Sequence, residues 1–303
     1  MKPSIKFLLS VASAITLATI ALILPSSCKP LELGLYKVFE HGPSVSERAD
    51  RLEEVKAPVP VMYGNRFAFL VTSDVHFGNN SPSYTPREDD SFYDELRTQM
   101  KNRAVPPSFG ICLGDVVENG NERDEFRDYV DWCDKVEDIL GTKNRVYTTT
   151  GNHDLYNDGW EYFEEYVYPH TGFFHFTAGG FSFYFLDTGS GSLGKKQYEL
   201  FEEAVKKDEL PKIVSTHVPV YGTAAFIQNY YSMQNTEESS QLITLCADNN
   251  VKLYLSGHMH TKNENNLGKF DEIVMPCYAV YHEFAIVTVD TDSHSVTWEF
   301  YDF

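Results

Sequence analysis

Cysteine and positive charge are both scarce in this 303-residue chain. Its five cysteines include no Cys-x-x-Cys pair, so a zinc site built from thiolates is not indicated. Lysine and arginine total 25 against 44 aspartates and glutamates, which gives a formal net charge of −19. Because long nucleic acids are bound by neutralising their phosphates, DNA or RNA is not expected as a partner. A small phosphorylated substrate is compatible with this charge, since bound divalent cations reverse the local field.

Internal repeats and low-complexity tracts are absent too, and the composition, rich in Phe and Tyr, is that of a globular protein. A chain of this length buries a large core, as one large domain or two small ones. Cys112 lies in an apolar stretch, so we expect it to be a small buried hydrophobe. A disulfide among Cys133, Cys246 and Cys277 is left open.

Long uncharged runs are missing except at the N-terminus, where two lysines precede the apolar segment 7–24. A basic start, an apolar middle and small residues before Cys28 are typical of an export signal, and the run is long enough for a marginal membrane span. The end of the segment resembles the lipobox of bacterial lipoproteins, although Pro25 stands where a leucine is usual. We therefore expect residues 1–27 to be a signal peptide, or alternatively an uncleaved signal anchor. The protein would be exported and held at the membrane through a lipid on Cys28.

Residues 28–64 contain four prolines, mixed charge and weak periodicity, which indicates a tether with at most a short helix near 45–55. The remaining residues, 65–303, form the predicted catalytic domain, in which apolar runs alternate with helical patterns. Helices are predicted at 91–101, 121–140, 160–166, 195–207 and 236–249. Strands 173–176 and 181–186 should form a hairpin, and 272–274, 284–289 and 296–300 an antiparallel meander. The alternation itself predicts parallel strands, so the sheets should be mixed.

Five apolar runs end in Asp, Asn or His, residue types that gain nothing from burial in a core. The runs 67–71, 109–113, 145–147, 212–214 and 251–255 lead into Asp74 and His76, Asp115, Asn152-His153-Asp154, His217, and His258 and His260. Ligands of α/β proteins collect beyond the carboxyl ends of such strands. Gly151 should break its strand, because glycine adopts backbone angles that other residues resist. A mixed set of oxygens and imidazoles suits Mn, Fe, Zn or Co better than Mg or Ca.

Read in order, Asp-x-His, Gly-Asp, Gly-Asn-His-Asp, a lone His after a strand, and Gly-His-x-His resemble the calcineurin-like metallophosphoesterase family. The motifs extend from Asp74 to His260. The segment 186–188, followed by Gly194 and Gln197, is similar to one in the branch that includes class III cyclic-nucleotide phosphodiesterases. The resemblance implies an α/β fold in which two mixed β-sheets pack as a sandwich flanked by helices, a four-layer αββα arrangement.

The same resemblance implies two divalent transition metal ions, with a hydroxide between them as the nucleophile. One ion would be held by Asp74, His76, Asp115 and His260, and the other by Asp115, Asn152, His217 and His258. His153 would contact the phosphate and protonate the leaving group, and Asp154 would orient His153.

These features predict an exported phosphoesterase that hydrolyses phosphomonoesters or phosphodiesters. The alternative is a surface lipoprotein that uses the fold as a non-catalytic binding module. The full ligand set together with His153 disfavours it, because a structural metal site needs neither an open position nor an acid. A nuclease is disfavoured by the acidic charge. Tyr221, Tyr230 and Tyr231 follow His217 and would either stack on a base or leaving group or pack beneath their loop.

Overall fold

The computed structural model describes residues 42–79, 89–141, 145–221 and 232–303. The predicted signal segment, Cys28, Tyr230 and Tyr231 lie outside the described residues. Within these ranges no helix is long and apolar enough to cross a membrane.

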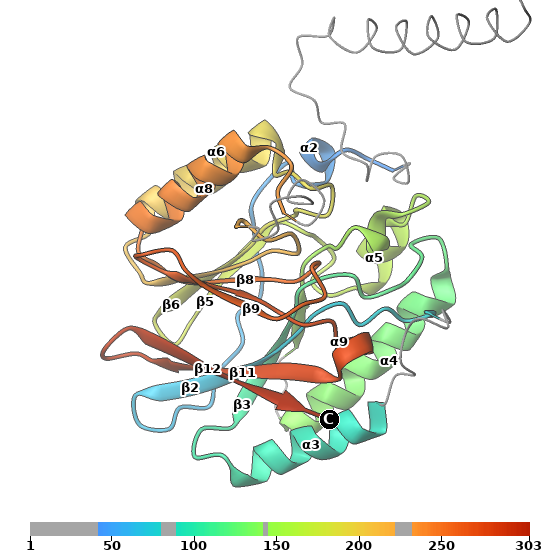
Figure 1. Ribbon diagram of the computed structural model, residues 1–303, viewed down its shortest axis with the longest axis vertical. Coiled ribbons are helices and arrows are strands. Elements are labelled where there is room, and N and C mark those ends of the chain that lie inside the picture. Colours follow the sequence, from blue (N-terminus) through green and yellow to red (C-terminus); the bar gives the residue numbers. More distant parts are fainter. Residues whose placement is uncertain (1–41, 80–88, 142–144, 222–231) are drawn as a thin grey trace, which may run out of the picture. The chain divides into compact units, whose positions relative to one another are not determined.

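The described strands form two mixed sheets (Figure 1). The seven-stranded sheet has the order β1 (Glu53–Glu54), β5 (Phe174–Ala178), β6 (Phe181–Phe185), β7 (Lys212–Ser215), β8 (Val251–Ser256), β10 (Asp271–Val274) and β9 (Asn263–Asn266). The five-stranded sheet has the order β12 (Ser295–Asp302), β11 (Glu283–Asp290), β2 (Arg66–Thr72), β3 (Pro107–Cys112) and β4 (Val146–Thr148). Parallel pairs run from β6 through β7 and β8 to β10, and from β2 through β3 to β4.

The main core lies between the two sheets and is built from strands that are buried on both faces. On β2, Phe67, Phe69 and Val71 point into this core, while the alternate residues Ala68 and Leu70 point to the outer face. Rings from both sheets meet there, since the Phe109 ring stacks on Phe69 at 5.2 Å and lies edge-on to Phe183 at 5.7 Å.

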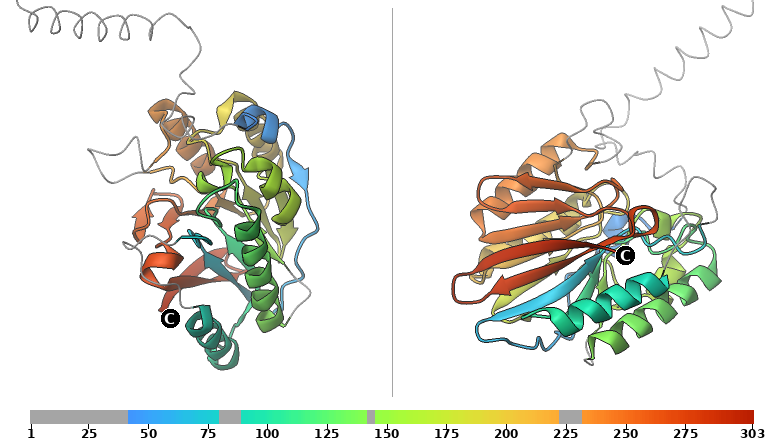
Figure 2. Two further views of the ribbon diagram at one scale, coloured as in Figure 1. Left: turned by 90° about the vertical axis from the view of Figure 1, so that its right-hand side faces the viewer. Right: turned by 60° about the horizontal axis from the view of Figure 1, so that its bottom comes forward.

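Helices cover the outer face of each sheet (Figure 2). The helices α3 (Asp89–Asn102), α4 (Arg123–Leu140) and α5 (Trp160–Tyr166) pack on the five-stranded sheet. On the seven-stranded sheet lie α6 (Gly194–Lys207) and α8 (Thr236–Asp248). Three apolar clusters thus separate four layers, which confirms the predicted αββα architecture.

Part of the segment predicted to be a tether is instead packed on the domain. The helix α2 (Val45–Arg48) buries Val45 and Ala49 in the apolar cluster under α6 and α8. After it, β1 adds a parallel edge strand beside β5. The sequence did not predict this packing, because only a few residues of the stretch are buried and its periodicity is therefore weak.

The C-terminal strands also differ from the predicted meander. β10 belongs to the seven-stranded sheet and is parallel to β8, whereas β11 and β12 belong to the other sheet. The chain crosses between the sheets through the short helix α9 (Tyr278–Tyr281). The sequence Asn-Glu-Asn-Asn of β9 gave no strand signal, since these residues are depleted in strands. Cys112, Cys133, Cys246 and Cys277 carry free thiols, and Cys112 is buried as expected.

We expect Phe109→Ala to lower the free energy of unfolding by about 3–5 kcal/mol, because it leaves a cavity between the sheets. Urea denaturation measures this loss. Val59→Ala is the control, since Val59 is 77% exposed and its truncation should change stability by no more than about 0.5 kcal/mol. Equal effects of the two substitutions would contradict the assignment of the core.

Candidate metal centre

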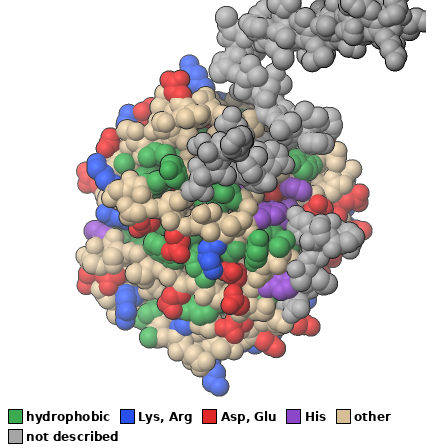
Figure 3. Space-filling view, in the orientation of Figure 1, with side chains coloured by type: hydrophobic (Ala, Val, Ile, Leu, Met, Phe, Trp, Pro, Cys, Tyr) green, Lys and Arg blue, Asp and Glu red, His purple; other side chains and the backbone are tan. Residues whose placement is uncertain are grey.

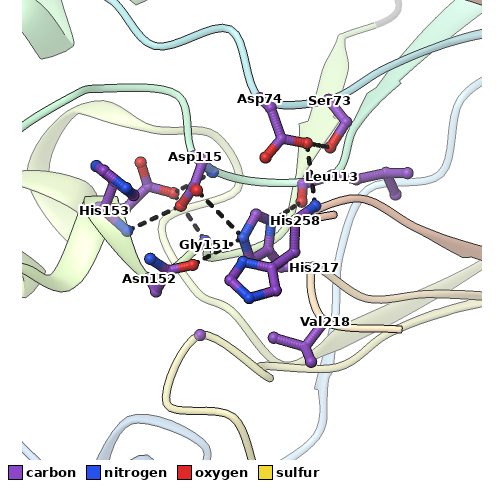
Figure 4. A network of polar contacts seen from close by, with 12 residues as sticks. Ser73, Asp74, Leu113, Asp115, Gly151, Asn152, His153, His217, Val218 and His258 are labelled. Atoms are coloured by element: carbon purple, nitrogen blue, oxygen red, sulfur yellow. Dashed lines mark hydrogen bonds and ion pairs between the residues drawn. The ribbon is translucent and has the colours of Figure 1, made fainter. Parts of the chain in front are cut away.

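The predicted ligands meet because the strands that carry them end at one edge. Thr72, Cys112 and Thr148 are neighbours across β2, β3 and β4, so the segments that follow these strands begin side by side. In the other sheet, Ser215 of β7 pairs with Leu255 of β8 just before the remaining histidines. Figure 4 shows the side chains from these loops turned toward one another.

One set of donors comes from the loops after β2, β3 and β8. Ligand atoms of its members lie within 4.8 Å of one another; the members are Asp74, His76, Asp115 and His260. The Nε2 atoms of His76 and His260 are 3.2 Å apart, and Asp74 Oδ1 is 3.2 Å from His260 Nε2. This is the first ligand set that the family resemblance implied.

A second set shares Asp115 with the first. Ligand atoms of Asp115, His217 and His258 lie within 4.8 Å of one another. His217 Nε2 is 3.3 Å from Asp115 Oδ2 and 3.0 Å from Asn152 Oδ1. The amide of Asn152 is oriented by Tyr156, whose hydroxyl accepts a hydrogen bond from Asn152 Nδ2 at 2.8 Å. All seven predicted ligands are therefore brought together.

The donor atoms of the second set fit a cation. His217 Nδ1 lies 2.7 Å from the carbonyl oxygen of Leu113, which only accepts, so Nδ1 carries the proton. The lone pair on Nε2 then faces the oxygens of Asn152 and Asp115, and these acceptors repel one another unless a cation or a proton lies between them. In the first set, Asp74 Oδ1 is buried and makes no hydrogen bond of normal geometry to any described residue. Imidazoles, carboxylates and one amide oxygen match the preferences of borderline transition ions.

The charges of the buried groups depend on each other. Burial opposes the charge on Asp74, but the neighbouring His260 outweighs it and lowers the pKa of Asp74 to about 2. Burial likewise opposes the charge on Asp115, yet His217 and His153 hold its pKa well below the ordinary value. Burial also disfavours charge on His217, and the Asp115 carboxylate reverses this and raises the pKa of His217 to about 9. A proton on His217 thus takes the place of a cation when no metal is bound.

Five of the candidate ligands have left-handed backbone, which is uncommon for residues other than glycine. Their φ angles are 56° at Asp74, 49° at His76, 50° at Asp115, 65° at His258 and 58° at His260. Gly151, in contrast, is not needed for a positive φ. A Cβ there would overlap the backbone nitrogen of Asp115, so its role is to let two ligand loops approach closely.

Asp154 has a different role from the predicted one. Its buried carboxylate accepts four backbone N–H groups at 2.8–3.2 Å, from Gly151, Asp115, Val116 and Val117. It therefore fixes the two ligand loops, while the ring of His153 is held elsewhere. Burial and the nearby Asp115 carboxylate raise the pKa of Asp154 to about 7, against the effect of the amide donors.

Glu118 is the residue that sequence reasoning missed. Its backbone carbonyl lies 2.8 Å from His153 Nδ1, and its carboxylate lies 3.0 Å from His76 Nδ1 and 3.9 Å from His153 Nδ1. It thus orients both rings, the task assigned to Asp154. The only sequence signal was its place three residues after Asp115.

A profile of the calcineurin-like phosphoesterase family matches residues 67–262, well over half of the chain. The chain belongs to the calcineurin-like phosphoesterase family. The matched residues include both donor sets, His153 and Glu118. Family membership supports metal-dependent hydrolysis of phosphoesters in general, and the donor sets are candidate metal sites of this family member.

Solved structures of several distant proteins resemble this chain, and the first of them shares its fold. A purple acid phosphatase of yellow lupin (Lupinus luteus) matches with a TM-score of 0.56 and 12% identity over 80% of this chain. This chain spans only 55% of the length of that protein. The Plasmodium protein GAP50 matches at 0.49 with 15% identity, covering 79% of this chain and 85% of its own. A putative 5'-nucleotidase of Staphylococcus aureus matches at 0.47 with 13% identity, over 77% of this chain and 53% of its own. No curated protein matches.

Asp154→Asn should weaken metal binding and lower stability. An amide offers one acceptor oxygen, so two buried N–H groups lose their partner and the free energy of unfolding should fall by about 1–3 kcal/mol. Metal titration and urea denaturation test this. Asp290→Asn is the matched control, because Asp290 also accepts backbone N–H groups, from Asp292 and Ser293, in an exposed turn. Wild-type metal affinity in Asp154→Asn would contradict the role of this residue.

Stability of the metal-stripped protein should depend on pH through His217. The pKa of this group is about 9 in the folded chain and near 6.5 when unfolded, so its pairing with Asp115 stabilises fully below pH 6.5. That contribution is lost as the pH rises through about 9. Thermal unfolding with a chelator present should show Tm falling over this range, and less steeply in His217→Gln. Parallel curves for the two proteins would exclude the effect.

Proposed function

We propose that this chain is an exported, dinuclear metal-dependent phosphoesterase that hydrolyses small phosphomonoesters or phosphodiesters. The observation that carries the proposal is the pair of donor sets that share Asp115, with His153 beside them. Export and lipid anchoring at Cys28 rest on the sequence of the first 28 residues. Family membership supports the general reaction class.

Asp74, His76, Asp115 and His260 would hold one ion, and Asp115, Asn152, His217 and His258 the other. Divalent ions bound there lower the pKa of water and offset the charge of a phosphoryl group. Asp115, as the shared ligand, would fix the separation of the two ions, and Mn, Fe, Zn or Co suits this donor set.

His153 is placed to exchange a proton with a bound ester. Its backbone N–H donates to Asp115 Oδ1 at 2.8 Å, which fixes the residue beside the shared ligand. Since Nδ1 faces the carbonyl of Glu118, the other ring nitrogen, Nε2, is the one that accepts or releases a proton. The side chain of His153 is 24% exposed and that of His260 is 29% exposed, so both can contact a substrate that enters from solvent. Histidine side chains are visible on the face drawn in Figure 3.

The ring of His153 is held from several sides, so its orientation does not require the substrate. It lies edge-on to His76 at 4.7 Å between ring centres and contacts Tyr156 at 4.6 Å. Tyr156 therefore supports both Asn152 and His153. Such fixed placement is what proton transfer to a leaving group demands.

His153→Ala should reduce turnover by about 10²–10⁴-fold while both ions stay bound, because the residue moves a proton and is not a ligand. Rates on p-nitrophenyl phosphate and bis-p-nitrophenyl phosphate, with metal analysis of the same samples, check this. His170→Ala is the matched control, since Nδ1 of this exposed histidine also faces a backbone carbonyl, that of Glu164 at 2.9 Å.

The two assay substrates separate the remaining possibilities. Faster cleavage of the diester would support a phosphodiesterase, and faster cleavage of the monoester a phosphatase or nucleotidase. Two bound ions with no turnover of a broad panel of phosphoesters would favour the non-catalytic binding module. Absence of bound metal would contradict the site.

A further inference from the structure

A buried ion pair joins the N-terminal segment to the loop that follows β6. The side chains of Arg48 and Asp187 are 1% and 0% exposed, with Arg48 Nε 2.8 Å from Asp187 Oδ2 and Nη2 3.3 Å from Oδ1. Nη2 also donates to the hydroxyl of Ser190 at 2.9 Å, and Nη1 donates to the carbonyl of Pro43 at 2.6 Å. The guanidinium lies 5.6 Å from the ring centre of Trp160. Every nitrogen of the guanidinium is thus engaged.

The loop held by Arg48 contacts the second donor set directly. Next to Asp187, Thr188 Oγ1 accepts the backbone N–H groups of His217 at 3.1 Å and Val218 at 2.9 Å. These bonds fix the backbone that carries the His217 ring, whose Nδ1 is held by Leu113.

The same loop also supports the turn that carries Asn152. A Cβ on Gly189 would lie 2.8 Å from the carbonyl oxygen of Gly151, so the two backbones are in close contact. Just before Asp187, the carbonyl of Leu186 accepts the hydroxyl of Thr149 at 3.1 Å. Two ligands of the second set therefore depend on the position of one loop.

The backbone of Asp187 is bound by Gln197, which accepts its N–H at 2.8 Å and donates to its carbonyl at 2.9 Å. The carboxylate has no cationic partner besides Arg48 among the described residues. Without the guanidinium, the buried carboxylate would keep the N–H of Gly189 as a donor but would have no counter-charge, so the loop would shift or admit water. Thr188 moves with any such shift, because it is the next residue.

We infer that Arg48 is a positioning residue for the second metal ion, acting through Asp187 and Thr188 on His217. The inference rests on the proposed two-ion function. It makes the segment around α2 a part of the metal centre as well as a link toward the N-terminus. The sequence alone gave this segment no role beyond that of a tether.

The test is metal binding by the full-length chain and its Arg48→Met variant. Zinc titrations against a chromophoric chelator give a Kd for each ion, and His217→Ala identifies which Kd belongs to the second ion. In Arg48→Met that Kd should rise about tenfold or more, as is usual when a supporting partner of a ligand is lost. The Kd of the first ion should stay within about twofold of the wild-type value, a much smaller change than that expected for the second ion.

Arg103→Met is the matched control. Arg103 forms an ion pair with Glu299 of β12 and its side chain is 12% exposed, but its partners do not touch the loop at Asp187. It should bind both ions as the wild type does. Arg48→Lys, which restores the charge without the two-pronged contact, should recover part of the lost affinity.

The double variant that combines Arg48→Met with Asp187→Asn tests whether Arg48 acts through Asp187. If Arg48 acts through Asp187, the double variant binds the second ion no more weakly than the worse single variant. The inference would be overturned if Arg48→Met were less stable but bound both ions with wild-type affinity. The ion pair of Arg48 and Asp187 would then contribute to stability alone. Should Arg48→Met fail to fold, the same criterion applies to Asp187→Asn. A wild type that binds fewer than two ions refutes the proposed function instead, and the inference with it.

Discussion

The Asp115 carboxylate is buried where loops from both sheets meet, so the groups around it must compensate its charge. Removing a carboxylate from water costs several kcal/mol, so it needs donors or cations on each side. One oxygen accepts the N–H of His153 and the other faces His76 and His217, while the amide of Asp115 itself donates to Asp154. These contacts come from three loops, those after β2, β4 and β7. Compensation of the Asp115 charge, by a proton on His217 or by a metal ion, therefore adds to the bonds of Asp154 in holding these loops together.

Backbone strain at the site has to be offset by packing elsewhere in the fold. A residue other than glycine in left-handed backbone costs on the order of 1 kcal/mol, and five candidate ligands adopt it. The total is comparable to a large part of the net stability of a typical domain, about 5–15 kcal/mol. The rings between the sheets, around Phe109 and Phe183, and the cluster under α6 and α8 must offset it. Bound cations would add to this, since they favour the strained arrangement over the unfolded chain.

Strand ends and their polar residues could be predicted because they depend on local patterns. Apolar runs of strand length followed by Asp, Asn or His marked the seven candidate ligands that the structure brings together. The alternation of elements predicted mixed sheets, and the family resemblance implied that they pack as a sandwich. What the sequence did not reveal depends on contacts far apart in the chain. Arg48 meets Asp187 across 139 positions, and no period in the sequence marks either one. The partner of His153 was misassigned because Asp154 is its neighbour in sequence, whereas Glu118 reaches it through folding. The alternation of apolar and polar residues in the C-terminal strands likewise does not indicate which of the two sheets each strand joins.

The net charge of the chain is negative, whereas the charge at its site would be positive with two metal ions bound. A protein with a net charge of −19 repels phosphorylated molecules at long range. At the site, however, the ligands contribute two carboxylates, Asp74 and Asp115, and the remaining ligands are neutral when they bind metal. Two divalent ions would outweigh those carboxylates and leave a local excess of positive charge, which acts only at short range because salt screens the rest. Attraction of the substrate would then depend on the ions themselves. The position of His217, whose backbone N–H Thr188 accepts, would therefore affect binding of an ester as well as its cleavage.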